Sequence, residues 1–389
     1  MKPGRSAIVL ALLALLAILG PDTLGLSDGI VAPPFSKPSW LDSSVAPVVE
    51  IELSSGGAEK DKNLSWNYEP PMRVAVTGRL SGVLLWHTPS GDFTLAEASD
   101  GEPGALDMDA RDMTFKRAIG LSPFANAAAA LFPSRGEYKL SIEGSGDVTM
   151  RMDGGRYGLL GTDHRGRDTA TLFIRGIRIS LIVGIAATAI ATLLGVSLGL
   201  LSGYVGGLTD SLIMRAVDVL MSIPTLPILM VITSVFGKGL WNLVLTLSIF
   251  SWMGTARTVR AMAMSLRSAP WVEELTAIGA GVRYIIFRHL LPEALPLLLA
   301  NVVLSVPSAI LSEAGLSFLG LSDPRLPSWG RMLHESYTFG AFINGAWWTI
   351  LPPGAGIALI CVLFMNIGRR IEEITDPRLM DAVKTKNGR

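Results

Sequence analysis

The chain has 389 residues, of which 49% are hydrophobic and 17% are charged, and its mean hydropathy is +0.44. This composition is too apolar for an ordinary soluble enzyme. The 33 basic and 33 acidic residues balance, which argues against nucleic-acid binding, because that function needs a basic face. The single cysteine, Cys361, excludes an internal disulfide, and the spacing of the four histidines predicts no metal site.

The apolar residues are concentrated in runs that contain no charged residue. A helix needs roughly 20 residues to cross about 30 Å of hydrocarbon, and most of these runs reach or approach that length. Continuous apolar runs, as opposed to alternation, indicate helices. We therefore expect a mainly α, polytopic membrane protein with six spans, at 6–21, 179–209, 219–237, 239–256, 294–312 and 336–368.

The first run is the shortest and has two interpretations. Lys2 and Arg5 precede an apolar core at Ala7–Leu19, which is also the pattern of a cleaved signal peptide. No small-x-small cleavage site follows the core, so an uncleaved N-terminal transmembrane anchor at residues 1–26 is favoured.

The distribution of basic residues predicts the orientation in the membrane. Lys2 and Arg5 place the N-terminus in the cytoplasm by the positive-inside rule. Counting spans from there, segment 255–293 and the C-terminal tail are also cytoplasmic, and both are rich in basic residues. Both termini are therefore expected inside.

The polar segment 27–158 is then expected to lie outside the cytoplasm. Alternation at 73–80 and 138–143 predicts strands, and turn signals stand at Ser90–Asp92 and Gly144–Asp147. Short strands of this kind are typical of a small β-rich, sandwich-like domain. The segment has no serine elbow, clustered histidines or convincing carboxylate pair, so a packing or docking module is favoured over an exterior catalytic site.

Small residues recur at every fourth position of the second run. They are Ala187, Ala191, Gly195, Gly199 and Gly203. This spacing keeps them on one helical face, where small side chains let another helix approach closely. The stripe predicts tight packing within one bundle, not a specific partner.

The cytoplasmic segment 271–292 (WVEELTAIGAGVRYIIFRHLLP) is the most informative part of the chain. It predicts a short helix, a break at Gly279 or Gly281, a second short helix and a proline at the start of the next span. The first helix is expected to expose a face that needs a partner. The residues of that face are Leu275, Ala277, Ile278 and Ala280.

This segment resembles the coupling loop of binding-protein-dependent ABC importer permeases, whose pattern is Glu-Ala-Ala-x-x-x-Gly followed by Ile-x-Leu-Pro. Glu273, Gly279 and Pro292 match the pattern. His289 stands in the isoleucine position, and Glu274 and Leu275 replace the two alanines, which changes the side chains that seat the loop. The resemblance implies an ATPase-coupling surface made of Glu273, Glu274, Leu275, Ala277, Gly279, His289 and Pro292.

Other stretches resemble one branch of that family, the second (C) permease of dipeptide and oligopeptide importers. They are Leu160–Asp168, Arg178–Leu181, Gly203–Gly207, Glu313–Leu321, Pro327–Gly330 and Asp376–Leu379. The resemblance implies a type I ABC importer permease fold for residues 159–389. It says nothing about the 27–158 domain, which is larger than the usual loop of that branch.

The resemblance also implies function and partners. The chain would import peptides or similar small solutes through the inner membrane of a bacterial or archaeal cell. Its partners would be a second permease, forming a heterodimer, ABC ATPase subunits and an extracytoplasmic solute-binding protein. Because the chain has no Gly-x-x-x-x-Gly-Lys-Ser/Thr loop, ATP would be hydrolysed by the partner, and we expect neither an enzyme nor a bound cofactor.

Four charged residues near the outer ends of spans are candidate gate or structural residues. Glu313 is the one acidic residue embedded in an apolar span, roughly 27 Å from its inner end at about 1.5 Å per residue. That depth favours capping or pairing near the outer interface over substrate contact. Asp163, Arg167 and Asp168 precede the second span, where they either dock the binding protein or cap and orient the helix.

Two other classes of function stay open on the sequence. A membrane-anchored receptor or scaffold would act through the external β-rich domain, and a stand-alone channel or secondary transporter would need no ATPase. The coupling-type loop favours the importer over both. The solute is open among peptides, nickel, sugars and glutathione-like molecules, because specificity in such systems usually resides in the separate binding protein.

Overall fold

The computed structural model describes residues 3–23, 29–54, 61–98 and 104–375, which fall into two compact units. The helical unit takes its residues from 1–26, 172–335 and 351–389, and the β unit takes them from 27–171 and 336–350.

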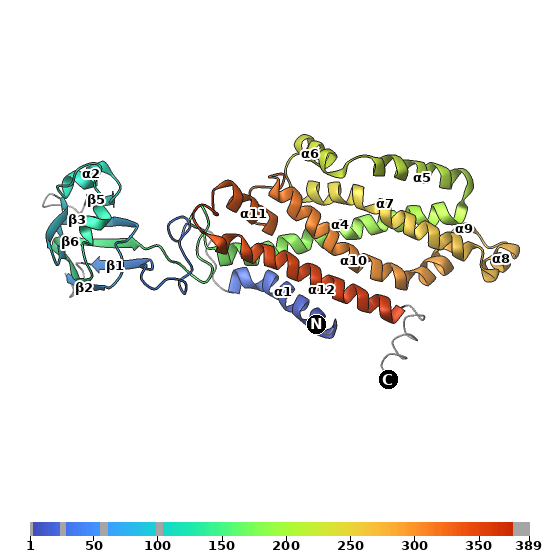
Figure 1. The fold of residues 1–389 in the computed structure, drawn as a ribbon, viewed down its shortest axis with the longest axis horizontal. Helices are drawn as coiled ribbons and strands as arrows, with labels where there is room; N and C mark the ends of the chain where they lie inside the picture. Colours follow the sequence, from blue (N-terminus) through green and yellow to red (C-terminus); the bar gives the residue numbers. More distant parts are fainter. Residues whose placement is uncertain (1–2, 24–28, 55–60, 99–103, 376–389) are drawn as a thin grey trace. The chain divides into compact units, whose positions relative to one another are not determined.

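The β unit is built on one antiparallel sheet (Figure 1). Its six strands are β1 (Val49–Ser54), β2 (Asp61–Trp66), β3 (Arg73–Thr88), β4 (Gly91–Ala98), β5 (Gly104–Asp109) and β6 (Gly136–Asp153). The long strands β3 and β6 pair at the centre; β1 and β2 pair with opposite ends of β6, and β4 and β5 with opposite ends of β3. The strands predicted at 73–80 and 138–143 are confirmed, and both extend further.

The β-rich prediction is confirmed, but the sandwich of two sheets is wrong, because all six strands belong to one sheet. Its halves meet at Gly82 and Gly144, which pair in register with φ values of +112° and +136°. A Cβ on Gly82 would lie 2.1 Å from the Glu143 carbonyl oxygen, so only glycine fits this crossing. The turn predicted at Gly144–Asp147 is wrong for that reason: these residues lie inside β6.

Both halves of the sheet contribute to a single apolar core. Val76 and Met150 come from one half, Trp86 and Leu140 from the other, and all four side chains are fully buried. The Trp86 indole N–H donates a 2.9 Å hydrogen bond to the Leu131 carbonyl. Two short helices, α2 (Met113–Ala118) and α3 (Ala127–Leu131), add buried side chains to this core.

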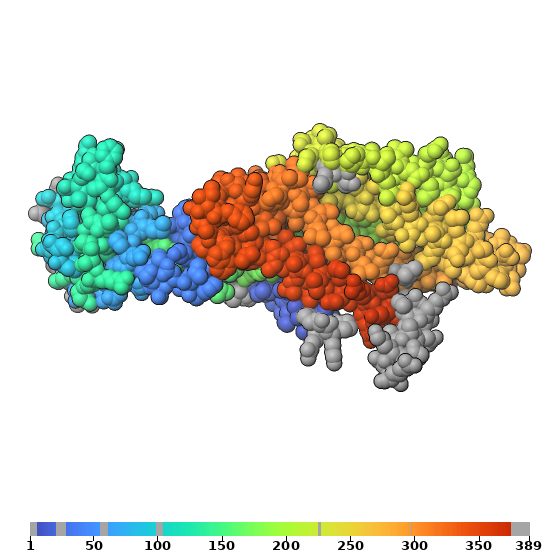
Figure 2. Space-filling model, in the orientation of Figure 1, coloured from blue at the N-terminus to red at the C-terminus, as the bar shows by residue number. Residues whose placement is uncertain are grey.

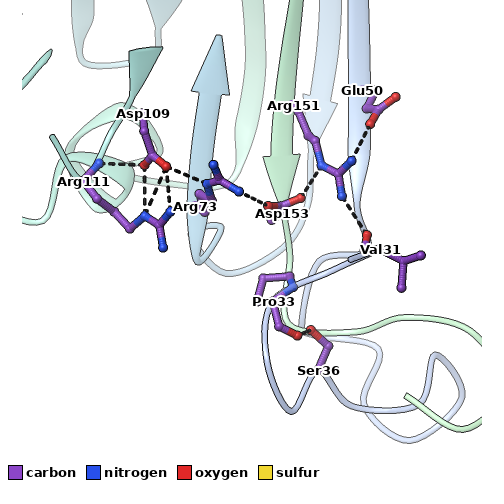
Figure 3. A network of polar contacts seen from close by, with 9 residues as sticks. All are labelled: Val31, Pro33, Ser36, Glu50, Arg73, Asp109, Arg111, Arg151 and Asp153. Atoms are coloured by element: carbon purple, nitrogen blue, oxygen red, sulfur yellow. Dashed lines mark hydrogen bonds and ion pairs between the residues drawn. The ribbon is translucent and has the colours of Figure 1, made fainter. Parts of the chain in front are cut away.

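Charged side chains form a row on the opposite face of the sheet, across β5, β3, β6 and β1 (Figure 3). Neighbours in the row form ion pairs in the order Arg111, Asp109, Arg73, Asp153, Arg151 and Glu50. Burial alone would raise the pKa of Asp109. Hydrogen bonds from the side chain and backbone of Arg111, and from Arg73, instead lower that pKa to about 2.

The helical unit is a bundle (Figure 1). Among the described residues, α4 and α10 take part in three apolar clusters: one shared with α1 and α12, one with α6 and α7, and one with α7 and α8. The helices are α1 (Pro3–Thr23), α4 (Thr169–Val205), α5 (Gly207–Ser222), α6 (Thr225–Phe236), α7 (Leu240–Arg267), α8 (Pro270–Ala277), α9 (Val282–Ile285), the π-helical turn η1 (Ile286–Leu290), α10 (Leu291–Phe318), α11 (Trp329–Thr338), the 3-10 turn η2 (Trp347–Thr349) and α12 (Leu351–Thr375). The first residues of α4, the last of α11 and the whole of η2 belong to the β unit.

The small-residue stripe of α4 lies against α7, which confirms packing within one bundle. A Cβ atom added to Gly195, Gly199 or Gly203 would lie 2.5–2.7 Å from the nearest atom of α7. Further along the same face, the Ser248 hydroxyl of α7 donates to the Ala187 carbonyl of α4 at 3.2 Å. The two backbones therefore meet at a distance that any larger residue would prevent.

Fewer than six helices meet the length and hydropathy expected of a membrane span in the described part of the chain. In the part of the chain that the structure describes, three helices are long and apolar enough to cross a membrane, at 169–205, 298–318 and 347–374. A fourth is added if the helices 207–222 and 227–236, which are bent by 94°, form one span. The apolar helix at Ser6–Gly20 is shorter, and α7 continues from its apolar part through arginines to Arg267. The count of six spans is not confirmed and stays a prediction.

The last apolar run, predicted as one span at 336–368, is divided. Residues 336–350 belong to the β unit, where the Phe339 ring stacks on His164 with centroids 3.9 Å apart. The Trp348 indole N–H donates to a backbone carbonyl of the same unit, and α12 begins only at Leu351. Glycines with left-handed backbone conformations interrupt the helix in between.

The contact between α4 and α7 generates a prediction. Gly199→Ala adds a Cβ 2.7 Å from the Ala256 carbonyl oxygen, so one backbone must move, at a cost of about 1–3 kcal/mol. We expect the midpoint of thermal unfolding in detergent to fall. Gly254→Ala on α7 is the matched control, since a Cβ there meets no atom within 4 Å. Equal midpoints for the two variants would contradict the packing.

The charged row generates a pH-dependent prediction. Because the folded-state pKa of Asp109 is lowered from 3.8 to about 2, its stabilising contribution is complete above pH 3.8 and is lost as the pH falls towards 2. Asp109→Asn should therefore weaken amide protection of β3 and β5 in hydrogen exchange at pH 7. The difference from wild type should shrink in acid, and a deficit of the same size at both pH values would contradict the assignment.

Candidate functional site

The segment between α7 and α10 forms a helical elbow at one end of the helical unit (Figure 1). Helix α8 begins with Pro270 in its first turn, where the missing N–H costs nothing, and ends at Ala277. After a turn at Gly279 the chain forms α9, passes through the π-helical turn η1 and continues without interruption into α10. The predicted helix, break and second helix are confirmed, with the break at Gly279.

The turn after α8 is a Schellman motif, which fixes the angle of the elbow. The Ala280 N–H donates to the Leu275 carbonyl at 3.0 Å, and the Gly279 N–H donates to the Thr276 carbonyl at 3.0 Å. Gly279 has a φ of +84°, a conformation that costs a residue with a Cβ about 1–2 kcal/mol. A glycine is therefore required here by the backbone alone.

The base of the elbow is packed against the ends of the long helices. Val272 of α8 and Ile285 of α9 are buried with Tyr204 of α4, Val259 of α7 and Leu290 of η1 in one apolar cluster. Because close-packed side chains move together, a displacement of α8 would be passed to α4, α7 and α10.

The outer surface of the elbow is uncovered by the rest of the helical unit (Figure 2, yellow-orange) and exposes apolar side chains among charged ones. Ile278 is 80% exposed and Phe287 is 67% exposed, and Ala277 and Val282 are exposed beside them. An apolar surface of this kind is typical of a protein contact.

The predicted composition of that face is partly wrong. Leu275 and Ala280 are half-buried and pack against the apolar cluster at the base of the elbow. These two residues occupy the positions before and after a Schellman turn that are often apolar and directed towards the core. Only Ala277 and Ile278 of the predicted set are exposed.

A hollow of about 640 Å³ lies beside α8. It is bounded by Tyr204 and Val205 at the end of α4, by Arg267 at the end of α7, and by Glu273 and Ala277 of α8, among others. The sequence did not predict that the ends of α4 and α7 would line this hollow. The one indication in the sequence was that both helices were expected to end on the same side of the membrane.

The other residues of the predicted coupling surface have mixed positions. Glu273, Glu274 and Pro292 are exposed. His289 is half-buried between the rings of Tyr284 and Trp271, with centroids 5.3 Å and 6.0 Å away, and its Nε2 atom is buried without a hydrogen-bond partner among the described residues. His289 therefore packs inside the elbow between two aromatic rings, while Glu273 and Glu274 lie on the surface of the elbow.

Two of the outer-side residues organise a loop of the β unit. The buried Asp163 carboxylate accepts hydrogen bonds from the backbone N–H groups of Arg165 and Arg167, each at 2.8 Å. It also pairs with the Arg167 guanidinium at 2.6 Å. Its oxygens are occupied within the loop, which leaves no free carboxylate for docking.

Asp168 is the N-cap of α4. Its carboxylate accepts hydrogen bonds from the backbone N–H groups of Ala170 and Thr171, at 3.2 Å and 3.1 Å, and from the Thr171 hydroxyl at 2.6 Å. This geometry satisfies donors that a helix start leaves unpaired. The sequence left two roles open for Asp168: docking the binding protein, or capping and orienting the helix. This geometry supports the second role.

Glu313 is buried in the helical unit, with 1% of its surface exposed. Its carboxyl group accepts a hydrogen bond from the Ser317 hydroxyl at 2.6 Å and lies 3.5 Å from the Ser180 hydroxyl of α4. It therefore connects α10 to α4 through hydroxyl groups, in agreement with a structural role.

Comparison with known proteins identifies relatives of the membrane half. Residues 195–381 match the family model described as "binding-protein-dependent transport system inner membrane component". The chain is 36% identical over 220 residues to a protein of Brucella suis that bears the name of a peptide permease, covering 56% of this chain and 72% of that protein.

Two further relatives have names that specify the solute. The di/tripeptide transport system permease protein of Pseudomonas aeruginosa is 36% identical over 226 residues, 58% of this chain and 73% of that protein. The dipeptide transport system permease protein of Bacillus subtilis is 35% identical over 220 residues, 56% of this chain and 68% of that protein.

Among solved structures, an inward-facing form of the MetNI methionine ABC transporter is similar to 53% of this chain and 96% of the compared chain. The sequence identity is 22% and the TM-score is 0.43.

The Schellman turn generates a prediction about the elbow. Gly279→Ala should loosen it by about 1–2 kcal/mol, because alanine is disfavoured at a φ of +84° while no neighbour lies within 4 Å to obstruct it. Amides of α8 should exchange hydrogen faster. Gly281→Ala is the control, since Gly281 has an ordinary φ of −72° and equally open surroundings. Equal exchange in both variants would mean that the turn tolerates a side chain.

Proposed function

We propose, from the premise that this chain belongs to the family of binding-protein-dependent transport system inner membrane components, that it is the permease subunit of an ATP-driven importer of di- or oligopeptides or similar small solutes. The observation that carries the proposal is the elbow of α8 and α9, with its apolar outer surface and its packed base. The peptide solute is supported by the names of the relatives. The chain is not an enzyme.

The elbow, residues 271–292, is the contact with the ATPase. A groove on the ATPase would receive Ala277, Ile278 and the glutamates beside them, Glu273 and Glu274. Closure of the ATPase pair on ATP would move α8 as a rigid body. Its buried base would pass that movement to α4, α7 and α10, which opens and closes the path to either side.

The assembly contains further subunits. A second permease completes the translocation path as a heterodimer, ABC ATPase subunits bind on the cytoplasmic side, and an extracytoplasmic solute-binding protein delivers the solute. The chain spans the inner membrane of a bacterial or archaeal cell six times, with both termini in the cytoplasm. The arginines of segment 255–293 support this orientation, because basic residues favour the cytoplasmic side. The domain at 27–158 lies outside.

The coupling contact is tested by co-purification of the tagged chain with its ATPase in mild detergent. Ile278→Asp puts a charge in the centre of the apolar contact and should reduce the ATPase recovered by about tenfold or more, since a buried isoleucine contributes about 1.5–3 kcal/mol. Ile343→Asp is the matched control, because Ile343 is 92% exposed and lies in the β unit. Recovery of no ATPase with wild-type chain that behaves as a folded oligomer would refute the importer and leave the β unit as the functional part.

A further inference from the structure

A cleft of about 760 Å³ lies on the face of the sheet that carries the charged row. Its floor is made of small side chains on adjacent strands: Ala75 and Thr77 of β3 and Thr149 of β6. Thr77 and Thr149 face each other in register. The hollow exists because these three residues are short while the residues around them are long. Its volume is in the range of pockets that hold small molecules, about 300–1,000 Å³.

One wall of the cleft is apolar. Ile30, Pro33 and Pro34 come from the segment before β1, and Met72 precedes β3. The wall is fixed to the sheet, because the Arg151 guanidinium donates to the Val31 carbonyl at 2.7 Å. An apolar group of a ligand would therefore find a preformed surface next to the charged row.

The two carboxylates that line the cleft, Glu50 and Asp153, are already paired with arginines, and so is Asp109, which pairs with two of the lining arginines (Figure 3). Asp109 accepts from Arg73 and from Arg111, at 2.7 Å in each case. Asp153 accepts from Arg151 at 2.7 Å. Glu50 also accepts from Arg151, at 3.1 Å. None of the three carboxylates needs a cationic ligand, and a cation would meet arginine side chains.

The arginines, in contrast, keep unused donors. The Arg111 guanidinium bonds only to Asp109 among the described residues, through Nε and one terminal nitrogen, and its side chain is 67% exposed. Arg165, which also lines the cleft, is exposed and uses only Nε in its side-chain contact with His164, within the same described part of the chain. The cleft is therefore lined by four arginines and two carboxylates, Glu50 and Asp153, and the remaining N–H groups favour an anion.

We propose that this cleft binds the carboxylate end of a short peptide, with Arg111 and Arg165 holding the carboxylate and the apolar wall holding the last side chain. A planar guanidinium matches a carboxylate with two parallel hydrogen bonds, which a lysine could not supply. The apolar wall distinguishes a peptide end from a bare inorganic anion. The proposal rests on the proposed peptide import for its choice of ligand, and it gives the β unit a role in retaining the solute beside the permease.

The test measures binding of an N-terminally dye-labelled peptide, Ala-Ala-Phe, to the purified full-length chain in detergent by fluorescence polarisation. The free acid should bind about tenfold or more tightly than the C-terminal amide, because the amide loses a charge-assisted pair. The double variant Arg111→Gln with Arg165→Gln should lose that preference. Both side chains are exposed and Asp109 keeps Arg73, so the fold is expected to survive, which the unchanged thermal midpoint would verify. Arg117→Gln, an exposed arginine of α2 outside the cleft, is the control and should bind as wild type does.

Three results would overturn the proposal: equal binding of acid and amide, unchanged binding by the folded double variant, or displacement of the dye-labelled peptide by sulfate as effective as displacement by unlabelled Ala-Ala-Phe. The last result would mean a site for any anion. If the chain co-purifies with its ATPase but fails this test, the peptide site in the cleft is refuted and the proposed import function stands. If the chain binds the peptide acid but co-purifies with no ATPase, the importer is refuted and the peptide site stands.

Discussion

The close approach of α4 and α7 is the contact on which the helical unit depends. The three glycines of α4 contribute no side chain to the contact, so the backbone and short side chains of α7 lie directly against the α4 backbone. Further along the same pair of helices, Leu200 and Tyr204 of α4 meet Val259 and Ala263 of α7 and form the floor on which the elbow is packed. If the helices were further apart, the side chains of this floor would separate, and α8 would lose its buried contacts with α4 and α7. The small-residue stripe of α4, which ends at Gly203 beside this floor, thus supports the base of the elbow.

The elbow combines a rigid base with an uncovered tip, and the two properties have different origins. Rigidity comes from local geometry, since the Schellman turn at Gly279 fixes the direction of the chain, and from burial of Val272 and Ile285. At the tip, the Ile278 side chain is 80% exposed, so the described part of the helical unit leaves it largely uncovered. A surface that is costly to leave in water, held on a support that moves as one piece, is what a coupling contact between two subunits requires.

The β unit differs from the helical unit in the row of ion pairs that it carries on one face of its sheet. Its core is complete without the charged row, because the two halves of the sheet bury their apolar side chains against each other. The row on the other face adds ion pairs between strands, in which the carboxylates Asp109 and Asp153 are largely buried and the arginines are partly exposed. Its alternation also leaves arginine donors at the margin of a cleft, so the same row that joins the strands carries the donors that the proposed ligand site would use.

The sequence by itself determined the features that depend on residues close together in the chain. Charge-free runs predicted apolar helices, spacing of four predicted the small face of α4, and a glycine after a short helix predicted the turn at Gly279, because each follows from the geometry of one helix. Alternation likewise predicted β3 and β6.

Tertiary structure decided which surfaces meet. It placed Gly144 in a strand crossing, where the local signal of a glycine is the same as in a turn, and it turned Leu275 inward. It also placed 336–350 in the β unit and brought Arg111, Arg73 and Arg151 into one row from distant parts of the chain. Those outcomes depend on the burial that distant segments gain together, and no short stretch of sequence contains that information.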